Sequence, residues 1–284
     1  MNTPTPGTLH IVATPIGNLG DFTTRAVETL KRVAAICAED TRHTRPLLQQ
    51  FGIATPLLAL HDHNESEVSA ALVQRMLAGD SLALVSDAGT PLISDPGYRL
   101  VRAAREAGIR VSPVPGASAL IAALSVAGLP SDRFVFEGFL PAKASARRER
   151  LQALVAEPRT LIFYESSHRI RDFLSDARAA FGGVRKMVVA RELTKLFETV
   201  LDGDLDTVLQ RVESDGDQQK GEFVVLIEGA GDDGDVTIVE GRRLYAKLCE
   251  YLKPSQAAKL AAELSGAPRK ALYGGDVQSP GQEA

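Results

Sequence analysis

The sequence predicts an α/β fold with two α/β domains and a small helical unit at the C-terminal end. Short apolar runs alternate with amphipathic stretches along most of the chain, which is the pattern of strands alternating with helices. The 284 residues suit about two domains, and an acidic, glycine-rich segment separates them from a basic C-terminal stretch. Hydrophobic residues are 44% and charged residues 24% of the chain, which excludes a fibrous or wholly disordered protein.

The first predicted domain covers residues 8–116. Apolar runs predict its strands, at residues 9–13, 35–38, 82–85 and 111–114. Apolar residues recur at helical spacing between these runs, and they predict helices at residues 26–33, 46–51, 65–78 and 98–107. The run at 82–85 is apolar throughout, as expected for a strand covered on both faces. This alternation predicts a parallel sheet with helices on both faces.

The second predicted domain covers residues 117–230. We place the boundary at Pro113, Pro115 and Gly116, which interrupt the apolar pattern and are followed by a predicted helix at 118–126. Strands are expected at residues 134–136, 160–163, 187–190, 198–201 and 223–227, with helices between them, one of which is at 205–212. The acidic segment 229–234 is interpreted as a linker.

Residues 241–275 predict a small unit that resembles a helix-turn-helix. Leucines mark a first helix (Leu244, Leu248 and Leu252), a second begins at Pro254, and a third short helix follows a break at Gly266. The unit is basic, and a second basic run lies at 143–150. Such patches either bind a polyanion or are ordinary solvated helix faces, and the charge pattern alone favours the second reading.

The cysteines and the apolar segments of the sequence indicate the cellular environment in which we expect the protein. Cys37 and Cys249 are the two cysteines, far apart in sequence, so neither a disulfide framework nor a cysteine-based zinc site is indicated. The residues that begin the chain do not have the pattern of a secretory signal, and the most apolar run, 117–129, is too short to span a bilayer. We therefore expect a soluble, cytoplasmic protein without a membrane or metal requirement.

Loops at the strand ends carry the candidate site, because ligands of open parallel sheets bind beyond the carboxyl ends of the strands. The loop at 14–21 lacks the glycine spacing of a dinucleotide fingerprint and the Walker lysine. Small residues and two aspartates in the loop at 86–97 predict a backbone-lined pocket, in which Asp87 can meet a ribose hydroxyl or a cationic ligand. The alternative is that Asp87 and Asp95 only cap turns.

Three further loops after predicted strands are rich in ionisable residues, at 39–45, 164–169 and 190–195. Charged loops at strand ends often serve a site. They can equally form structural ion-pair networks, and His168 can simply begin a helix. The spacing of these residues matches neither a zinc motif nor a nucleophile elbow.

Taken in order, these segments resemble the bacterial 16S rRNA cytidine 2′-O-methyltransferases of the tetrapyrrole methylase superfamily. The resemblance covers nearly the whole chain, and eight motifs in register make it specific. The motifs are VATPIGNLGD, AEDTRHT, LHDHNE, LVSDAGTPLISDPG, PVPGASAL, FEGFLPAK, FYESSHR and ARELTK followed by ET. Tetrapyrrole-directed relatives carry Gly-Pro-Gly and Gly-Asp-Pro where this chain has Thr14–Gly17 and Ser86–Pro91, which favours the rRNA branch.

The resemblance implies that S-adenosylmethionine binds in a cleft between the two α/β domains of a homodimeric enzyme. The implied cofactor residues are Pro15, Asp87, Ala88, Gly89, Thr90, Ser118, Ala119, Tyr164, Leu193 and Phe223. The implied partner is 16S rRNA or the small ribosomal subunit, and neither a phosphate cradle nor a metal is required.

The implied reaction is methyl transfer to a cytidine ribose 2′-hydroxyl, which needs in-line orientation and a base. The candidates for the base or its orienting partner are Asp40, His43, Glu165, Glu192 and Lys195. The candidates for RNA contacts are Arg42, Arg147, Arg148, Arg169, Arg191, Arg269 and Lys270. Two alternatives stay open: a sister-branch methyltransferase acting on a tetrapyrrole or a protein side chain, and a non-catalytic ribosome-binding protein.

Overall fold

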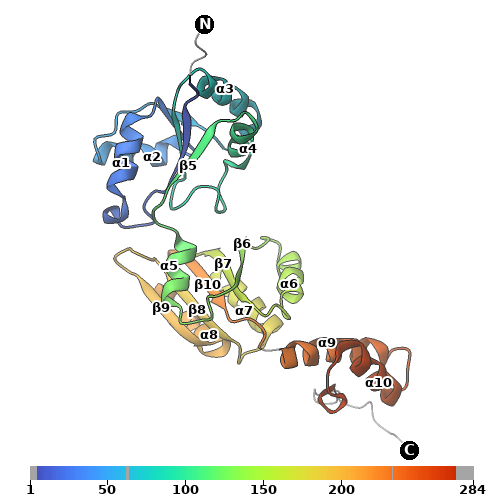
Figure 1. Cartoon of the computed structure of the whole chain (residues 1–284). Coiled ribbons are helices and arrows are strands. Elements are labelled where there is room, and N and C mark those ends of the chain that lie inside the picture. Colours follow the sequence, from blue (N-terminus) through green and yellow to red (C-terminus); the bar gives the residue numbers. More distant parts are fainter. Residues whose placement is uncertain (1–4, 62–63, 232, 273–284) are drawn as a thin grey trace, which may run out of the picture.

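The structure, a computed structural model of the chain, describes residues 5–61, 64–231 and 233–272. It contains two β-sheets that follow one another along the chain, and a helical unit at the C-terminal end (Figure 1). The α/β fold predicted from the sequence is confirmed.

The first sheet is parallel and has the strand order β3-β2-β4-β1-β5. Its strands are β1 (Thr8–Val12), β2 (Ala35–Ala38), β3 (Leu57–Ala59), β4 (Leu82–Val85) and β5 (Arg110–Val114). Its helices are η1 (Leu19–Asp21), α1 (Thr24–Arg32), α2 (Thr41–Gln50), α3 (Glu65–Leu77) and α4 (Tyr98–Glu106). Leu30 and Leu48 of α1 and α2 pack on one face, and Met76 and Leu100 of α3 and α4 pack on the other. Helices therefore cover both faces, as the sequence predicted.

The second sheet is mixed and has the strand order β6-β7-β10-β8-β9. Its strands are β6 (Phe134–Phe139), β7 (Thr160–Ser166), β8 (Lys186–Arg191), β9 (Thr199–Asp204) and β10 (Glu222–Ile227). Only the β6–β7 pair is parallel in this sheet. Its helices are α5 (Ala119–Val126), α6 (Ala144–Ala153), α7 (Ile170–Phe181) and α8 (Leu205–Ser214), with the short η2 (Gly216–Gln219). Helix α5 packs on one face through Leu120 and Leu124, and α7 packs on the other through Phe173.

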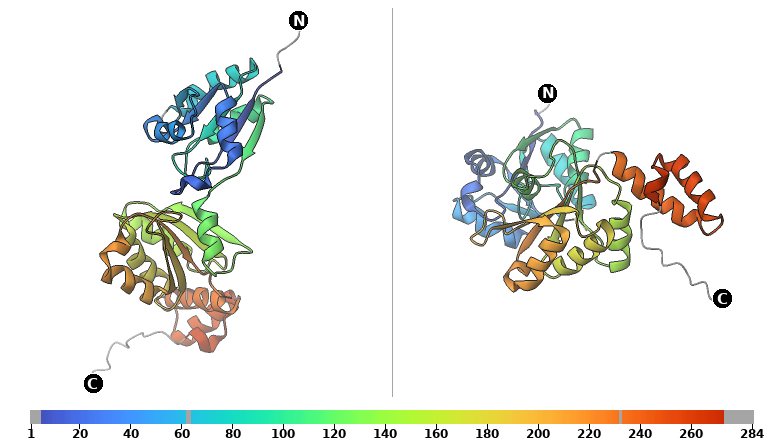
Figure 2. Two further views of the ribbon diagram at one scale, coloured as in Figure 1. Left: turned by 90° about the vertical axis from the view of Figure 1, so that its left-hand side faces the viewer. Right: turned by 90° about the horizontal axis from the view of Figure 1, so that it is seen from below.

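The C-terminal unit consists of α9 (Asp233–Leu248), α10 (Pro254–Ser265) and η3 (Arg269–Leu272). Ala261, Ala267 and Leu272 form its small core, which is separate from the cores of the two sheets. The unit lies at the end of the molecule away from the first sheet (Figures 1 and 2). Gly266 ends α10 in the left-handed conformation with φ 76°, as a glycine C-cap does.

Several boundaries differ from the sequence-based expectation. Strand β3 was not predicted, and α2 begins at Thr41 because the Asp40 side chain accepts a hydrogen bond from the Arg42 N–H and caps it. Helix α9 already begins at Asp233, inside the predicted linker, and ends at Leu248. The third C-terminal helix is a 3₁₀ turn, and the predicted residues beyond Leu272 lie outside the described part.

No helix within residues 5–61, 64–231 and 233–272 has the length and apolar character that crossing a membrane requires.

Candidate functional site

A cavity of about 450 Å³ lies between the two sheets and is lined by residues from both parts of the chain. Nine of the ten residues expected at a cofactor site line it: Asp87, Ala88, Gly89, Thr90, Ser118, Ala119, Tyr164, Leu193 and Phe223. The tenth, Pro15, is buried in the loop after β1 and is not among the lining residues. The volume is in the range of small-molecule sites.

The loops after β1 and β4 are hydrogen-bonded to each other where they border this cavity. Thr14 and Gly89 exchange two backbone hydrogen bonds, of 2.9 and 3.2 Å. The Thr14 hydroxyl donates to the Ser86 carbonyl, and the Ser86 hydroxyl donates to the Gly89 carbonyl. Gly89 has φ 85°, and a Cβ there would lie 3.2 Å from the Ile16 side chain, so glycine is required for this close approach.

The rest of the loop after β4 is held in an uncommon backbone conformation. Leu92 and Ser94 have φ values of 72° and 68°, which non-glycine residues rarely adopt. Gly97 has φ 125°, and a Cβ there would lie 2.5 Å from Leu84. The Thr90 hydroxyl donates to the Ala117 carbonyl and ties the loop to the start of α5. These contacts fix the position of Ser94 and Asp95, which both line the cavity.

Tyr164, at the end of β7, forms the opposite wall. Its hydroxyl oxygen accepts a hydrogen bond of 3.1 Å from the N–H of Leu120 in the first turn of α5. Its ring makes edge contacts with Phe136 and Phe139, at centroid distances of 4.9 and 5.7 Å. Burial, aided by the charge of Asp95, raises the pKa of Tyr164, so the phenol stays protonated.

Four carboxyl groups line the cavity: Asp87, Asp95, Glu165 and Glu222. Burial and the nearby charges of Glu39 and Asp87 raise the pKa of Asp95 to about 6, although the Ser86 hydroxyl lowers it. Burial also raises the pKa of Glu165, whose Oε1 accepts the Ser166 N–H. Carboxyl groups with raised pKa values in a cavity are typical of functional sites.

Glu165 is the predicted catalytic residue that reaches the cavity. Its side chain is fully buried, and its Oε2 lies 3.3 Å from Arg169 without forming a hydrogen bond. Asp40 instead caps α2 and pairs with Arg42 at 2.7 Å; hydrogen bonds from Arg42 hold the pKa of Asp40 well below its usual range. His43 is exposed on α2, and neither Asp40 nor His43 lines the cavity.

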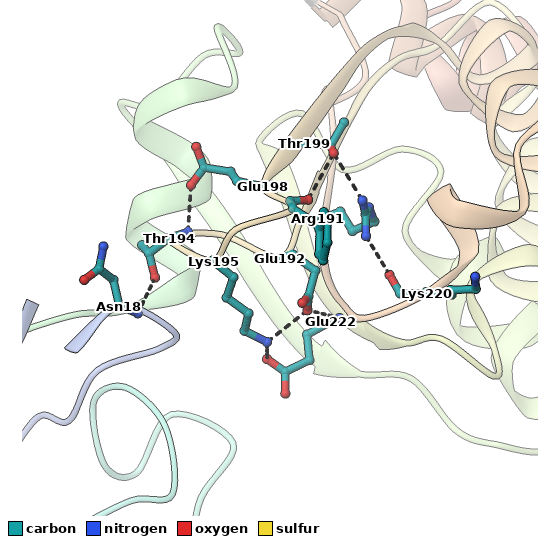
Figure 3. A network of polar contacts seen from close by, with 10 residues as sticks. Asn18, Arg191, Glu192, Thr194, Lys195, Glu198, Thr199, Lys220 and Glu222 are labelled. Atoms are coloured by element: carbon teal, nitrogen blue, oxygen red, sulfur yellow. Dashed lines mark hydrogen bonds and ion pairs between the residues drawn. The ribbon is translucent and has the colours of Figure 1, made fainter. Parts of the chain in front are cut away.

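Glu192 and Lys195 belong to an ion-pair network beside the cavity (Figure 3). The Lys195 ammonium donates 2.9 Å hydrogen bonds to Glu192 and Glu222, and the Glu222 N–H donates to the same Glu192 oxygen. Burial alone would lower the pKa of Lys195, but its two carboxylate partners raise it. Lys195 therefore stays protonated in this arrangement and cannot accept a proton.

The same turn also joins the two parts of the molecule. The Asn18 N–H, from the loop after β1, donates a 3.1 Å hydrogen bond to the Thr194 hydroxyl, and the Thr194 N–H donates to Glu198 at 2.6 Å (Figure 3). Gly17 lies against Lys195 so closely that any side chain at position 17 would collide with it. The turn thus fixes how the two sheets face each other across the cavity.

The arginines expected to contact RNA have different surroundings. Arg147 is 3% exposed and donates to Asp176, and Arg191 is 7% exposed and donates to the Lys220 carbonyl and the Thr199 hydroxyl. Their burial is at odds with the expected phosphate contacts, because these guanidinium groups are used inside the protein. Arg169 also donates to a backbone carbonyl, that of Leu140.

The remaining basic candidates are accessible. Arg42 and Arg148 have side chains 90% and 67% exposed and pair with Asp40 and Asp176. Arg269 and Lys270 are exposed on η3 of the C-terminal unit, where Arg269 also donates to the Ser255 carbonyl.

Sequence reasoning did not select several residues that line the cavity. Asp95 belonged to the loop predicted to line a pocket but was assigned no role there, with turn capping as the alternative, and Phe139 was part of a motif without a role. The other unselected lining residues are Ile16, Ile93, Ser94, Ser166, Ser167, Ala190, Gly221, Glu222 and Val224. One feature of the sequence could have identified Ser94 and Asp95 as cavity residues, namely their position in the long loop of small residues after β4.

Known proteins are similar to this chain over most of its length. It is 68% identical to the ribosomal RNA small subunit methyltransferase I of Xylella fastidiosa (strain Temecula1) over 271 residues, which cover 95% of this chain and 99% of the relative. It is 54% identical to the protein of that name from Pseudomonas aeruginosa, over 97% of this chain and 99% of the relative.

Solved structures share the fold at low identity. The structure of diphthine synthase has a TM-score of 0.58 at 14% identity and covers 93% of this chain and 98% of its own. The structure of the methyltransferase CobJ has a TM-score of 0.57 at 19% identity and covers 79% of this chain and 95% of its own.

Two family models match the chain, one over the α/β region and one over the C-terminal unit. The model described as RsmI C-terminal HTH domain matches residues 235–274, which include α10, η3 and all but the first two residues of α9. The model described as Tetrapyrrole (Corrin/Porphyrin) Methylases matches residues 8–209, more than half of the chain. Together with the high identity to the curated relatives, this match shows that the chain belongs to the tetrapyrrole (corrin/porphyrin) methylase family.

Proposed function

We propose that this protein uses S-adenosylmethionine to methylate the 2′-hydroxyl of a cytidine ribose in 16S rRNA of the small ribosomal subunit. The observation that carries the proposal is the single cavity that gathers nine of the ten expected cofactor residues from both parts of the chain. The names of the relatives that are 54–68% identical support an rRNA substrate. A cytoplasmic location and a homodimer are part of the proposal.

The lining residues fit S-adenosylmethionine chemically. The Oε2 atom of Glu165 is buried at the cavity without a hydrogen bond, so it suits a ligand that brings a hydroxyl or ammonium donor. Ile16, Leu193 and Phe223 supply apolar surface for a flat ring system. Ser118 and Ala119 stand at the start of α5, where backbone N–H groups are available to a carboxylate.

The chain itself contributes orientation, exclusion of water and acid–base groups. S-adenosylmethionine supplies an electrophilic methyl group on a positively charged sulfur. The apolar lining and the interdomain contact at Thr194 enclose the space in which a hydroxyl is aligned with that methyl group. The Tyr164 hydroxyl, which accepts the Leu120 N–H, keeps its own proton for donation into the cavity.

The first experiment measures methyl transfer. Small ribosomal subunits that lack the modification are incubated with the purified protein and labelled S-adenosylmethionine, and the 16S rRNA is then digested and mapped by mass spectrometry. We expect one methyl group on a cytidine ribose. Label on a base, on ribosomal protein or on a tetrapyrrole would assign the protein to another branch, and no label anywhere would leave a binding protein.

Matched variants on α5 test the cavity as the cofactor site. Ala119→Phe places a bulky ring in the cavity and should abolish S-adenosylmethionine binding in calorimetry. Ile121→Phe changes a residue of the same helix that is 52% exposed and does not line the cavity, so binding should persist. Equal affinity of the two variants would contradict the proposed cofactor site.

The C-terminal unit is proposed to contact RNA phosphates, which position a substrate without reading its sequence. Replacing the exposed Lys253, Lys259 and Lys270 by glutamine in the full chain should weaken RNA binding and reduce its salt dependence, by a slope of about 2 for three single-strand contacts. The control removes the same number of charges from α1, at Arg25, Lys31 and Arg32. An unchanged slope in the first variant would contradict an RNA role for this unit.

A further inference from the structure

The four carboxyl groups of the cavity differ in their partners. Glu222 is paired with Lys195, Glu165 lies beside Arg169, and an oxygen of Asp87 accepts the backbone N–H of Asp40. The charged groups that face Asp95 are Glu39 at the end of β2 and Asp87 at the end of β4, and Tyr164 faces it from β7. Within the described residues, neither Asp87 nor Asp95 forms a salt bridge with a cation, and Asp95 also has two acidic groups, Glu39 and Asp87, acting on it.

Asp95 lines the cavity but is not one of the expected cofactor residues, and its neighbour Ser94 lies beside β6. Ser94 contacts Gly138 of β6, where a Cβ would lie 3.1 Å from the Ser94 hydroxyl oxygen. The next residue along β6, Phe139, lines the cavity and is nevertheless 55% exposed. This end of the cavity combines a carboxyl group with an accessible aromatic ring, and Tyr164 borders it. Six of the nine expected cofactor residues that line the cavity lie instead at the start of α5 and in the loop at 87–90.

An aromatic ring at the rim and a carboxyl group within reach suit an unpaired nucleotide. Proteins recognise single-stranded RNA by stacking splayed-out bases on aromatic side chains, and a ribose hydroxyl brings a proton that a carboxylate accepts. We propose that Asp95 is the general base of the methyl transfer and that Phe139 stacks on the acceptor base, an inference that rests on the proposed function.

The proposed step is an in-line substitution at the methyl carbon. The 2′-oxygen of the ribose forms a bond to the methyl carbon while the bond between that carbon and sulfur breaks, and the bonding electron pair stays on sulfur as a neutral thioether. The hydroxyl proton passes to the Asp95 carboxylate and from there to solvent. Burial, with the acidic neighbours Glu39 and Asp87, raises the pKa of Asp95 to about 6, which makes it a stronger base than an ordinary aspartate, and at neutral pH it is still mostly ionised.

The strained loop explains how Asp95 is held in place. Leu92 and Ser94, with φ values of 72° and 68°, stand before Asp95, and Gly97, with φ 125°, follows it. Such conformations persist only where the surroundings determine them, and they occur preferentially at functional sites. A base must be fixed within hydrogen-bond reach of the proton that it removes, and this loop provides that rigidity.

The decisive measurement is the single-turnover rate with saturating S-adenosylmethionine and small-subunit RNA. Asp95→Asn should lower this rate about 10²- to 10⁴-fold, with the affinity for S-adenosylmethionine within threefold of wild type. Asp132→Asn changes a surface carboxyl group that pairs with Arg133 and does not line the cavity, so it should leave the rate unchanged. If Asp95→Asn keeps the single-turnover rate, whatever its affinity for S-adenosylmethionine, Asp95 is not the base.

The pH dependence of the rate is a second test, and its main measurement uses the wild-type protein. The wild-type single-turnover rate should rise with pH up to an apparent pKa near 6 and then level off. Asp95→Glu should retain a sloping limb, and Asp95→Asn should lose it. A wild-type profile that is flat from pH 5 to 8 would overturn the assignment. Failure of the proposed function looks different, since the wild-type protein would then not label a 16S ribose at all.

The proposed stacking role of Phe139 is tested separately from the role of Asp95, through the KM for RNA. Phe139→Ala should raise the KM for RNA about tenfold to a hundredfold while the rate at saturating RNA changes little, and Phe139→Tyr should restore the KM. Phe134→Ala, at the other end of the same strand and outside the cavity lining, is the matched control. An unchanged KM in Phe139→Ala would overturn the stacking role.

Discussion

Two loops on opposite sides of the cavity share a backbone feature and differ in their charges. The described non-glycine residues with positive φ all fall in these loops: Leu92 and Ser94 in the loop at 86–97, and Glu192 and Thr194 in the turn at 192–198. In the first loop, Asp95 has acidic neighbours and a raised pKa. In the second, Glu192 and Lys195 neutralise each other, and Thr194 bonds across to Asn18.

The difference indicates that backbone strain serves two purposes in one site. Where the charge has no opposite partner, strain holds a group that is able to exchange a proton. Where Glu192 and Lys195 pair with each other, the strained turn also places Thr194 against Asn18 of the other domain, so it joins the two domains. Both loops contain ionisable residues in the sequence, and the structure distinguishes them by the pairing of Glu192 with Lys195.

The largest expected effect concerns the backbone of the first loop. Gly97→Ala should lower the free energy of unfolding by about 3 kcal/mol, because it adds strain at φ 125° and an overlap with Leu84. Gly108→Ala, at φ 73° with no atom within 4 Å of the new Cβ, should lose only about 1 kcal/mol. Urea denaturation compares the two, and equal losses would show that the loop at 86–97 is not tightly held.

The next largest effect is a rise in the free energy of unfolding when Asp95 is replaced by asparagine. The pKa of Asp95 is raised to about 6 in the folded protein, so ionising it costs stability as the pH rises from about 4 through 6. Asp95→Asn should therefore be about 1.5 kcal/mol more stable than wild type at pH 7.5, a figure reduced for partial exposure, and the gain should vanish below pH 4. Denaturation curves at the two pH values check this, and a variant less stable than wild type at pH 7.5 contradicts it.

The paired loop should respond to pH in the opposite direction. Burial alone would raise the pKa of Glu192, but the hydrogen bonds from Lys195 and Glu222 bring it below its usual value. The pairing thus stabilises the protein above about pH 4 and is lost as the pH falls through the folded-state pKa. Lys195→Met should cost about 1 kcal/mol at pH 7 and less at pH 3.5. The same deficit at both pH values would mean that the ion pair contributes nothing.

The smallest effect tests the contact between the domains. Thr194→Val removes the hydroxyl oxygen that accepts the Asn18 N–H and should cost about 0.5 kcal/mol. Thr194→Ser keeps that oxygen and should be closer to wild type. Thermal unfolding of both variants provides the measurement. If valine and serine behave alike, the hydrogen bond between Asn18 and Thr194 does not hold the domains together.

The sequence was sufficient for the first sheet apart from β3. The apolar run at 82–85 predicted β4 because both of its faces are covered, whereas Leu57–Ala59 is only three residues long and follows a proline. The order of the second sheet was not readable, because β10 pairs with β7 and β8 through contacts distant in sequence. The expected cofactor residues came from motif resemblance, and nine of the ten line the cavity, Pro15 being the exception.

The charged candidates could not be sorted from sequence alone. Glu192 and Lys195 are partners because a positive φ turns the chain back and because Glu222 arrives from β10. Arg147 is buried against Asp176, which comes from α7 and is separated from it by 29 positions. The raised pKa of Asp95 depends on its burial and on Glu39, which follows β2 in another part of the sequence. Each outcome depends on tertiary neighbours that local pattern does not encode.

The strand order of the second sheet constrains how this protein is made. Strand β10 lies in the middle of that sheet, yet it is the last of its strands to leave the ribosome. Until Glu222–Ile227 emerges, β7 and β8 each expose an edge whose hydrogen-bonding groups lack their partner strand. Open edges of this kind invite intermolecular pairing. A premature stop before residue 222 would therefore yield an aggregation-prone product, whereas a stop after residue 230 would leave the sheet complete.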